Sequence, residues 1–186
     1  MTDLFRHKSV FGYTGTGKTT VAKERARFYL KYKQQVFVYP GNGDTDWPRG
    51  VKYVWSPEQL EEVLSNPENY GAFIFLDEGA ALYDEVSRKH HPLVHGLFMR
   101  GRHYGFTVWI ITQYTTSIPR KVRINCTERY IFGTADDDDA KMIWKDCNRI
   151  SVEGKPLWQA IMSLDRFEYF RYVHPGEITK HKTKKP

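Results

Sequence analysis

Cysteine is scarce in this 186-residue chain: Cys126 and Cys147 are the only two, and neither belongs to a Cys-x-x-Cys pair. This scarcity excludes a disulfide framework and a cysteine-rich zinc site, and we expect both residues to be reduced thiols. His91 and His95 have the spacing of a metal-binding pair, but Pro92 lies between them and no third ligand is evident. The sequence therefore predicts no zinc.

Long hydrophobic runs are also missing. The longest, 72–76 and 106–111, fall well short of the roughly twenty apolar residues that span a bilayer. The first eight residues lack the apolar core of a secretory signal. A hydrophobic content of 40% and a charged content of 27% are typical of a globular protein. These features predict a cytoplasmic protein without a transmembrane segment.

The chain has no excess of acidic residues: 28 Lys and Arg residues outnumber 22 Asp and Glu residues, which gives a formal net charge of +6. A positive balance suits a polyanionic partner, although a chain of this size makes it only suggestive. No repeat or low-complexity linker divides the sequence. We therefore expect a single domain over 1–175 and a basic, disordered tail over 176–186.

The most informative motif that is present matches the phosphate-binding pattern G-x-x-x-x-G-K-[ST] without a mismatch. Its glycines allow backbone N–H groups to surround a polyphosphate, its lysine reaches the β- and γ-phosphates, and the hydroxyl after the lysine binds Mg²⁺. Strong helix formers follow, so the positive end of a helix faces the phosphates. The predicted ATP-binding residues are Gly12, Tyr13, Thr14, Gly15, Thr16, Gly17, Lys18, Thr19 and Thr20.

A second motif lies downstream, where the apolar run 71–76 ends in Asp77 and Glu78. An acidic pair alone could be a solvated strand end, but after a phosphate-binding loop it is typical of a Walker B motif. We expect Asp77 to hold Mg²⁺ together with Thr19, and Glu78 to act as the general base on the attacking water.

Two further positions complete the predicted catalytic set. Gln113 ends the strand that follows Walker B, where its amide can reach the γ-phosphate or the water, and Thr112 beside it could act likewise. Arg102, with Arg100 as second choice, ends the preceding helix and could act as an arginine finger in the neighbouring subunit. The structural alternatives are a polar strand cap for Gln113 and a favourable helix-dipole contact for the arginines.

Another acidic run, Asp136–Asp139, resembles a metal site but precedes a helical pattern. We expect it to cap that helix.

Alternation of strand and helix patterns predicts a three-layer α/β P-loop NTPase of the ASCE or RecA-like type, with a mainly parallel sheet. The stretch 157–173 alternates and predicts a C-terminal β-hairpin. The long separation of Lys18 from Asp77 leaves room for two extra strands. From it we expect a strand inserted between the phosphate-loop strand and the Walker B strand, as in ATPases with a catalytic Glu.

Taken together, the phosphate loop, the run ending in Asp77–Glu78 and the segment 100–113 resemble the FtsK/HerA superfamily of DNA-pumping ATPases, and especially the small viral genome-packaging ATPases. The resemblance covers about residues 8–135. It implies a hexameric or pentameric ring that threads double-stranded DNA, with Mg²⁺ and ATP bound between subunits and Arg102 supplied in trans. It also implies pore loops, for which 41–49 and 115–123 are candidates, and a capsid or portal partner at a virion vertex in the host cytoplasm.

Two other functions stay open on the sequence. One is an assembly or export ATPase, like those of filamentous phages and secretion systems, which moves protein or single-stranded DNA. The other is a P-loop nucleotide kinase, which would transfer phosphate to a small acceptor and ignore DNA.

Overall fold

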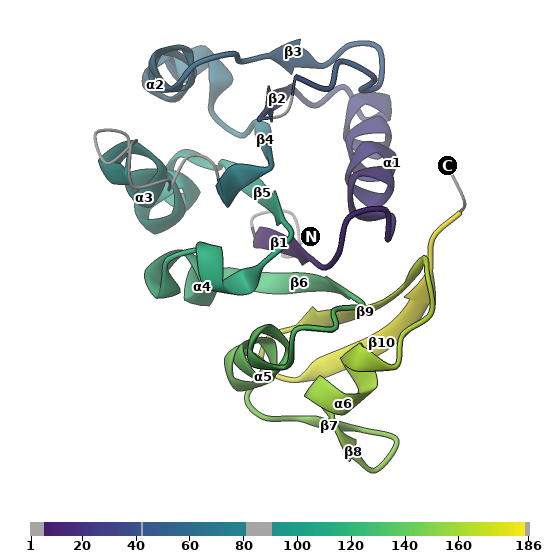
Figure 1. Ribbon diagram of the computed structural model, residues 1–186. Coiled ribbons are helices and arrows are strands. Elements are labelled where there is room, and N and C mark those ends of the chain that lie inside the picture. Colours follow the sequence, from purple (N-terminus) through teal and green to yellow (C-terminus); the bar gives the residue numbers. More distant parts are fainter. Residues whose placement is uncertain (1–5, 42, 81–90, 185–186) are drawn as a thin grey trace.

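The computed structural model describes residues 6–41, 43–80 and 91–184, and its centre is an eight-stranded sheet (Figure 1). The strand order is β10-β9-β6-β1-β5-β4-β2-β3. The six strands from β6 to β3 are parallel, whereas β9 and β10 are antiparallel. The strands are β1 (His7–Phe11), β2 (Val36–Pro40), β3 (Lys52–Tyr53), β4 (Phe73–Asp77), β5 (Thr107–Thr112), β6 (Cys126–Phe132), β9 (Glu168–Val173) and β10 (Glu177–Lys182).

Helices cover both faces of the sheet, which gives the three predicted layers. They are α1 (Lys18–Lys31), α2 (Pro57–Ser65), α3 (His91–Arg100), α4 (Arg120–Asn125), α5 (Asp137–Asp146) and α6 (Leu157–Met162). Short 3₁₀ turns η1 (Pro67–Asn69), η4 (Gly101–Tyr104) and η5 (Thr115–Ser117) and a small hairpin of β7 (Ser151–Val152) and β8 (Lys155–Pro156) complete the elements. Crossing a bilayer would need a longer and more apolar helix than any in the described ranges.

Side chains alternate between the two faces of the central strands. Phe73 and Phe75 of β4 pack with α1, whereas Ile74 and Leu76 of the same strand pack with α2, α3 and α4. Both sets are buried, which explains why β4 is a continuous apolar run rather than an alternating one. Farther along the sheet, α5 and α6 pack on Phe11 and Ile131, on the side opposite α1.

The strand between the phosphate-loop strand β1 and the Walker B strand β4 is present, but a different segment supplies it. We expected it from the residues between Lys18 and Asp77; instead β2 and β3 lie beyond β4, and β5 pairs with both β1 and β4. This order is the reason that Gln113, at the end of β5, lies between the two motifs.

The C-terminal part differs most from the sequence prediction. The hairpin is formed by β9 and β10, and the start of the stretch expected to alternate is the helix α6. Residues 177–182 are therefore strand rather than disordered tail, because each pairs with a residue of β9 and Ile178 packs against the core. Helix α3 agrees with the end of a helix expected over 85–103, whose first residues lie outside the described ranges.

Candidate nucleotide-binding and catalytic site

The phosphate-binding loop connects the carboxyl end of β1 to the first turn of α1, as the motif predicts. Gly12 has a φ of 135°, and a Cβ there would lie 2.6 Å from the Cβ of Phe132. Gly17 has a φ of 104°, and its Cβ would lie 2.7 Å from Cγ2 of Thr183. Both positions combine a left-handed backbone with close packing, so only glycine fits.

The start of α1 leaves amide donors available to a ligand. Within α1, which the structure describes in full, no side chain caps the first turn and no acid lies in it. The first N–H groups of a helix have no partner inside the helix, and together they attract anions. A phosphate group fits this cradle by charge and by hydrogen bonding.

Lys18 lies between the loop and the two acids of the Walker B motif. Its side chain is buried, and Nζ donates a hydrogen bond to the carbonyl oxygen of Tyr13 at 2.7 Å. Burial lowers the pKa of the Lys18 ammonium below its ordinary value, while the negative charges of Glu78 and Asp77 act in the opposite direction. The structure thus brings Lys18 and both acids into one electrostatic environment.

Asp77 ends β4 as a buried carboxylate with an unsatisfied oxygen. Oδ2 has no hydrogen-bond partner among the described residues, although the side chain is only 2% exposed. Burial raises the pKa of Asp77 to about 6, and the nearby charges of Glu78 and Asp44 raise it further. A buried carboxylate without a partner is costly unless a cation balances it, so Asp77 and the hydroxyl of Thr19 fit a Mg²⁺ ion.

Glu78 has an unusual backbone and one clear side-chain partner. Its φ is 51°, a left-handed conformation that costs a non-glycine residue on the order of 1–3 kcal/mol. Its backbone is held closely, since a Cβ on Gly41 would lie 2.6 Å from the carbonyl oxygen of Asp77 and 3.2 Å from Cβ of Glu78. Gln113 Nε2 donates a hydrogen bond to Glu78 Oε1 at 3.4 Å. The structure therefore joins Gln113 to the expected base.

Thr112, the neighbour of Gln113, points elsewhere. Its hydroxyl lies 3.2 Å from the Ser117 hydroxyl and 3.4 Å from the Tyr114 carbonyl oxygen, so it holds η5 in place. It is a structural residue of the turn.

The two arginines lie away from this set. Arg102 is in η4, where its Nη2 donates to Asn125 Oδ1 at 3.3 Å. Gly101 beside it approaches His7, the first residue of β1, and the charge of Arg102 adds to burial in lowering the pKa of His7 to about 3. The phosphate loop begins at the other end of β1, so Arg102 does not reach the site of its own chain. Arg100, also exposed, ends α3.

The acidic run 136–139 caps a helix, as expected. Asp136 accepts a hydrogen bond from the Asp139 backbone N–H at 2.8 Å. Asp139 is buried and accepts the Thr116 N–H at 3.1 Å, which ties η5 to α5.

Sequence reasoning missed the C-terminal residues that contact the phosphate loop. Arg166 Nε donates to the Gly15 carbonyl oxygen at 3.0 Å, and Phe167 packs beside Gly17. Thr183 is buried against Gly17 and donates its N–H to Phe167 O at 2.8 Å. No motif marks these residues, because the β9–β10 hairpin brings them to the loop from the far end of the chain.

Comparison with known proteins places these motifs in a familiar fold. The family model described as zonular occludens toxin (Zot) matches residues 53–135, and no curated protein matches the chain. The genome packaging NTPase B204 from Sulfolobus turreted icosahedral virus 2, in complex with AMPPCP, superposes with a TM-score of 0.78 at 14% identity, covering 97% of this chain and 98% of that one.

Two other solved structures share the fold. The pCW3 conjugation coupling protein TcpA gives a TM-score of 0.74 at 13% identity, covering 96% of this chain and 60% of its own. The N-terminal domain of zonular occludens toxin from Neisseria meningitidis gives 0.60 at 13% identity, covering 97% and 94%. The chain therefore has a P-loop NTPase fold, and its resemblance to FtsK/HerA ATPases and to the small viral genome-packaging ATPases is confirmed at the level of the fold.

Proposed function

We propose that this chain is an ATP-hydrolysing motor that translocates double-stranded DNA and packages a viral genome. The observation that carries the proposal is the arrangement around Asp77: a buried carboxylate without a partner lies beside Glu78, and Glu78 is bonded to Gln113. The likeness in fold to the genome packaging NTPase B204 over nearly the whole of both chains supports the choice of substrate.

In the proposed mechanism the chain's own residues divide the work. The loop amides and Lys18 bind the phosphates, and Asp77 with Thr19 holds Mg²⁺. When bound, this ion neutralises charge on the phosphate oxygens. Glu78 accepts a proton from the attacking water, while Gln113 holds the carboxylate in place.

Arg102 is proposed to act on a neighbouring subunit of a hexameric or pentameric ring. Its exposure and its place at the opposite end of β1 from the phosphate loop support a role in trans. Arg102→Ala chains mixed with Glu78→Gln chains should recover part of the ATPase activity, since mixed interfaces combine an intact base with an intact finger. Rings that form but recover no activity at any ratio would rule out this role.

The place of action is proposed to be the host cytoplasm, with a capsid or portal protein as partner at a virion vertex. An assembly or export ATPase is the second candidate. The Zot family match and the fold shared with a conjugation coupling protein favour it, because proteins named for other processes have the same architecture. A nucleotide kinase is disfavoured by β5 between β1 and β4 and by Glu78.

Displacement of a triplex-forming strand from duplex DNA tests the proposal. We expect the oligomer to release the third strand in the presence of ATP and Mg²⁺ but not with a non-hydrolysable analogue. ATP hydrolysis without any release, or stimulation by single-stranded DNA alone, would support the second candidate instead. Phosphate transfer to a nucleoside monophosphate would identify a kinase.

A further inference from the structure

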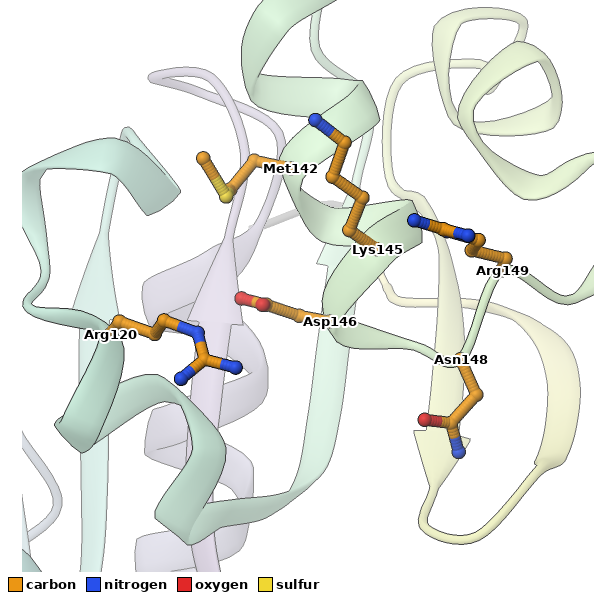
Figure 2. A pocket seen from close by; sticks show the side chains of 6 residues that line it. All are labelled: Arg120, Met142, Lys145, Asp146, Asn148 and Arg149. Atoms are coloured by element: carbon orange, nitrogen blue, oxygen red, sulfur yellow. The ribbon is translucent and has the colours of Figure 1, made fainter.

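A basic pocket of about 500 Å³ lies between α4 and the end of α5. Arg120 of α4 lines one side, and Lys145 of α5 and Arg149 of the following turn line the other (Figure 2). The remaining lining residues are Met142, Asp146 and Asn148. Three cations thus surround a hollow that has one acid.

The single acid of the pocket is already neutralised. Arg123 Nε donates to Asp146 Oδ2 at 2.6 Å, and both side chains are largely buried. Within the described part of the chain, no ion pair involves Arg120, Lys145 or Arg149, and all three are exposed. The pocket therefore presents three uncompensated positive charges.

Helix stability does not account for this cluster. Cations at the end of α5 are favoured by the helix dipole, but Arg120 is the first residue of α4, where the dipole disfavours a cation. The turn that carries Arg149 is also fixed in an uncommon form: Asn148 and Arg149 have φ values of 56° and 55°. Asn148 Nδ2 donates to the carbonyl oxygen of Pro175 at 2.9 Å, which holds the turn against the β9–β10 hairpin.

The pocket is connected to the catalytic residues by one short segment. Gln113 ends β5 and contacts Glu78, and the chain then passes through η5 directly into α4. Asp139 holds η5 through Thr116, and Arg123 Nη1 donates to the Ile118 carbonyl oxygen at 2.7 Å. Movement of Arg120 is thereby linked to the position of Gln113.

From this arrangement we infer that the pocket formed by Arg120, Lys145 and Arg149 binds the phosphate backbone of duplex DNA and couples that contact to the catalytic Gln113. The inference rests on the proposed function and assigns its DNA contact to these residues. Contacts with phosphates alone do not read sequence, which suits a motor that moves along any duplex. Arg123, which the sequence placed in the same basic segment, belongs to the internal ion pair instead.

Binding of labelled duplex DNA by the full chain, measured by fluorescence anisotropy at several salt concentrations, tests the inference. The pocket variant is Arg120→Glu/Lys145→Glu/Arg149→Glu, and the matched control is Arg27→Glu/Lys31→Glu/Lys33→Glu, three exposed cations in and just after α1. Each phosphate contact contributes about 0.9 to the salt slope, or about eightfold in affinity near 0.1 M salt. We expect the pocket variant to bind roughly a hundredfold more weakly, and the control to keep most of the affinity of the unaltered protein.

Two further readouts separate this contact from a folding defect. The pocket variant should keep its thermal stability and basal ATP hydrolysis while losing stimulation by duplex DNA. The milder variant Arg149→Gln should reduce the salt slope by about 0.9. Unchanged affinity and salt slope in both variants, or an altered mass in solution with unchanged DNA binding, would overturn the inference and leave the proposed function intact. If the unaltered protein fails to bind duplex DNA, the proposed function itself fails.

Discussion

The amide of Gln113 donates a hydrogen bond to the carboxylate of Glu78 at 3.4 Å, and it thereby joins the ends of the neighbouring strands β5 and β4. Because Glu78 also has a left-handed backbone, this bond acts on a residue that the surrounding structure already holds in one orientation. Orientation of the base is the property that the first prediction examines.

Replacing Gln113 by alanine should lower kcat about tenfold while leaving the KM for ATP nearly unchanged, because the base loses its positioning partner. Gln113→Glu should shift the pH profile of kcat upward, since a second carboxylate disfavours ionisation of Glu78. Steady-state kinetics over pH 5–9 provide the measurement, with Gln159→Ala, an exposed change on α6, as the control. Equal losses in kcat for the control would contradict the prediction.

The pKa of Asp77, raised from 3.8 to about 6 in the folded protein, predicts how stability depends on pH. Because the folded state binds the proton more tightly, unfolding becomes easier as pH rises from about 4 to 6. At neutral pH the buried charge should cost on the order of 3 kcal/mol. Asp77→Asn should therefore stabilise the metal-free protein at pH 7.5 but make little difference at pH 4.

Urea unfolding at the two pH values measures this difference, with the exposed change Glu61→Gln as the control. The same Asp77→Asn protein should no longer be stabilised by adding Mg²⁺ with ATP. A variant less stable than the unaltered protein at pH 7.5 would contradict the account of Asp77 as an unbalanced charge.

Two arginines of α4 should respond in opposite ways to truncation. Arg123→Ala leaves the Asp146 charge buried without a partner and should lower the free energy of unfolding by about 3–5 kcal/mol. Arg120→Ala removes an exposed side chain and should change it by no more than about 0.5 kcal/mol. Thermal or urea unfolding of both variants checks the contrast, and a similar loss in both would refute it.

Arg166 should affect nucleotide affinity more than stability. Its side chain is exposed, and its hydrogen bond to the Gly15 carbonyl oxygen helps to shape the phosphate loop. Arg166→Ala should raise the KM for ATP about three- to tenfold, the usual value of one hydrogen bond. Arg149→Ala is a matched control outside the loop, and it should leave the KM for ATP unchanged.

The sequence was most informative where chemistry restricts residue type. The loop from Gly12 to Thr19 and the pair Asp77–Glu78 could be located because their roles tolerate few substitutes. The parallel sheet followed from the apolar run of β4, which is buried on both faces. The cap at Asp136 was also confirmed, because local hydrogen bonding at a helix start is encoded within a few residues.

Contacts between distant segments could not be predicted in this way. The tail expected over 176–186 contains β10, whose pairing with β9 outweighs its charged composition. The same hairpin brings Arg166 and Thr183 to the phosphate loop, and no local pattern announces that approach. Likewise, only the folded structure separates Arg123, which is internally paired, from Arg120, which is exposed.

The central claim is that Glu78 catalyses ATP hydrolysis that duplex DNA stimulates. Its most direct test is the rate of phosphate release by the unaltered protein and by Glu78→Gln, each with and without duplex DNA, together with binding of a fluorescent ATP analogue. We expect the unaltered protein to be faster with duplex, and the variant to bind nucleotide normally while losing nearly all turnover in both conditions. Near-normal hydrolysis by Glu78→Gln would contradict the account.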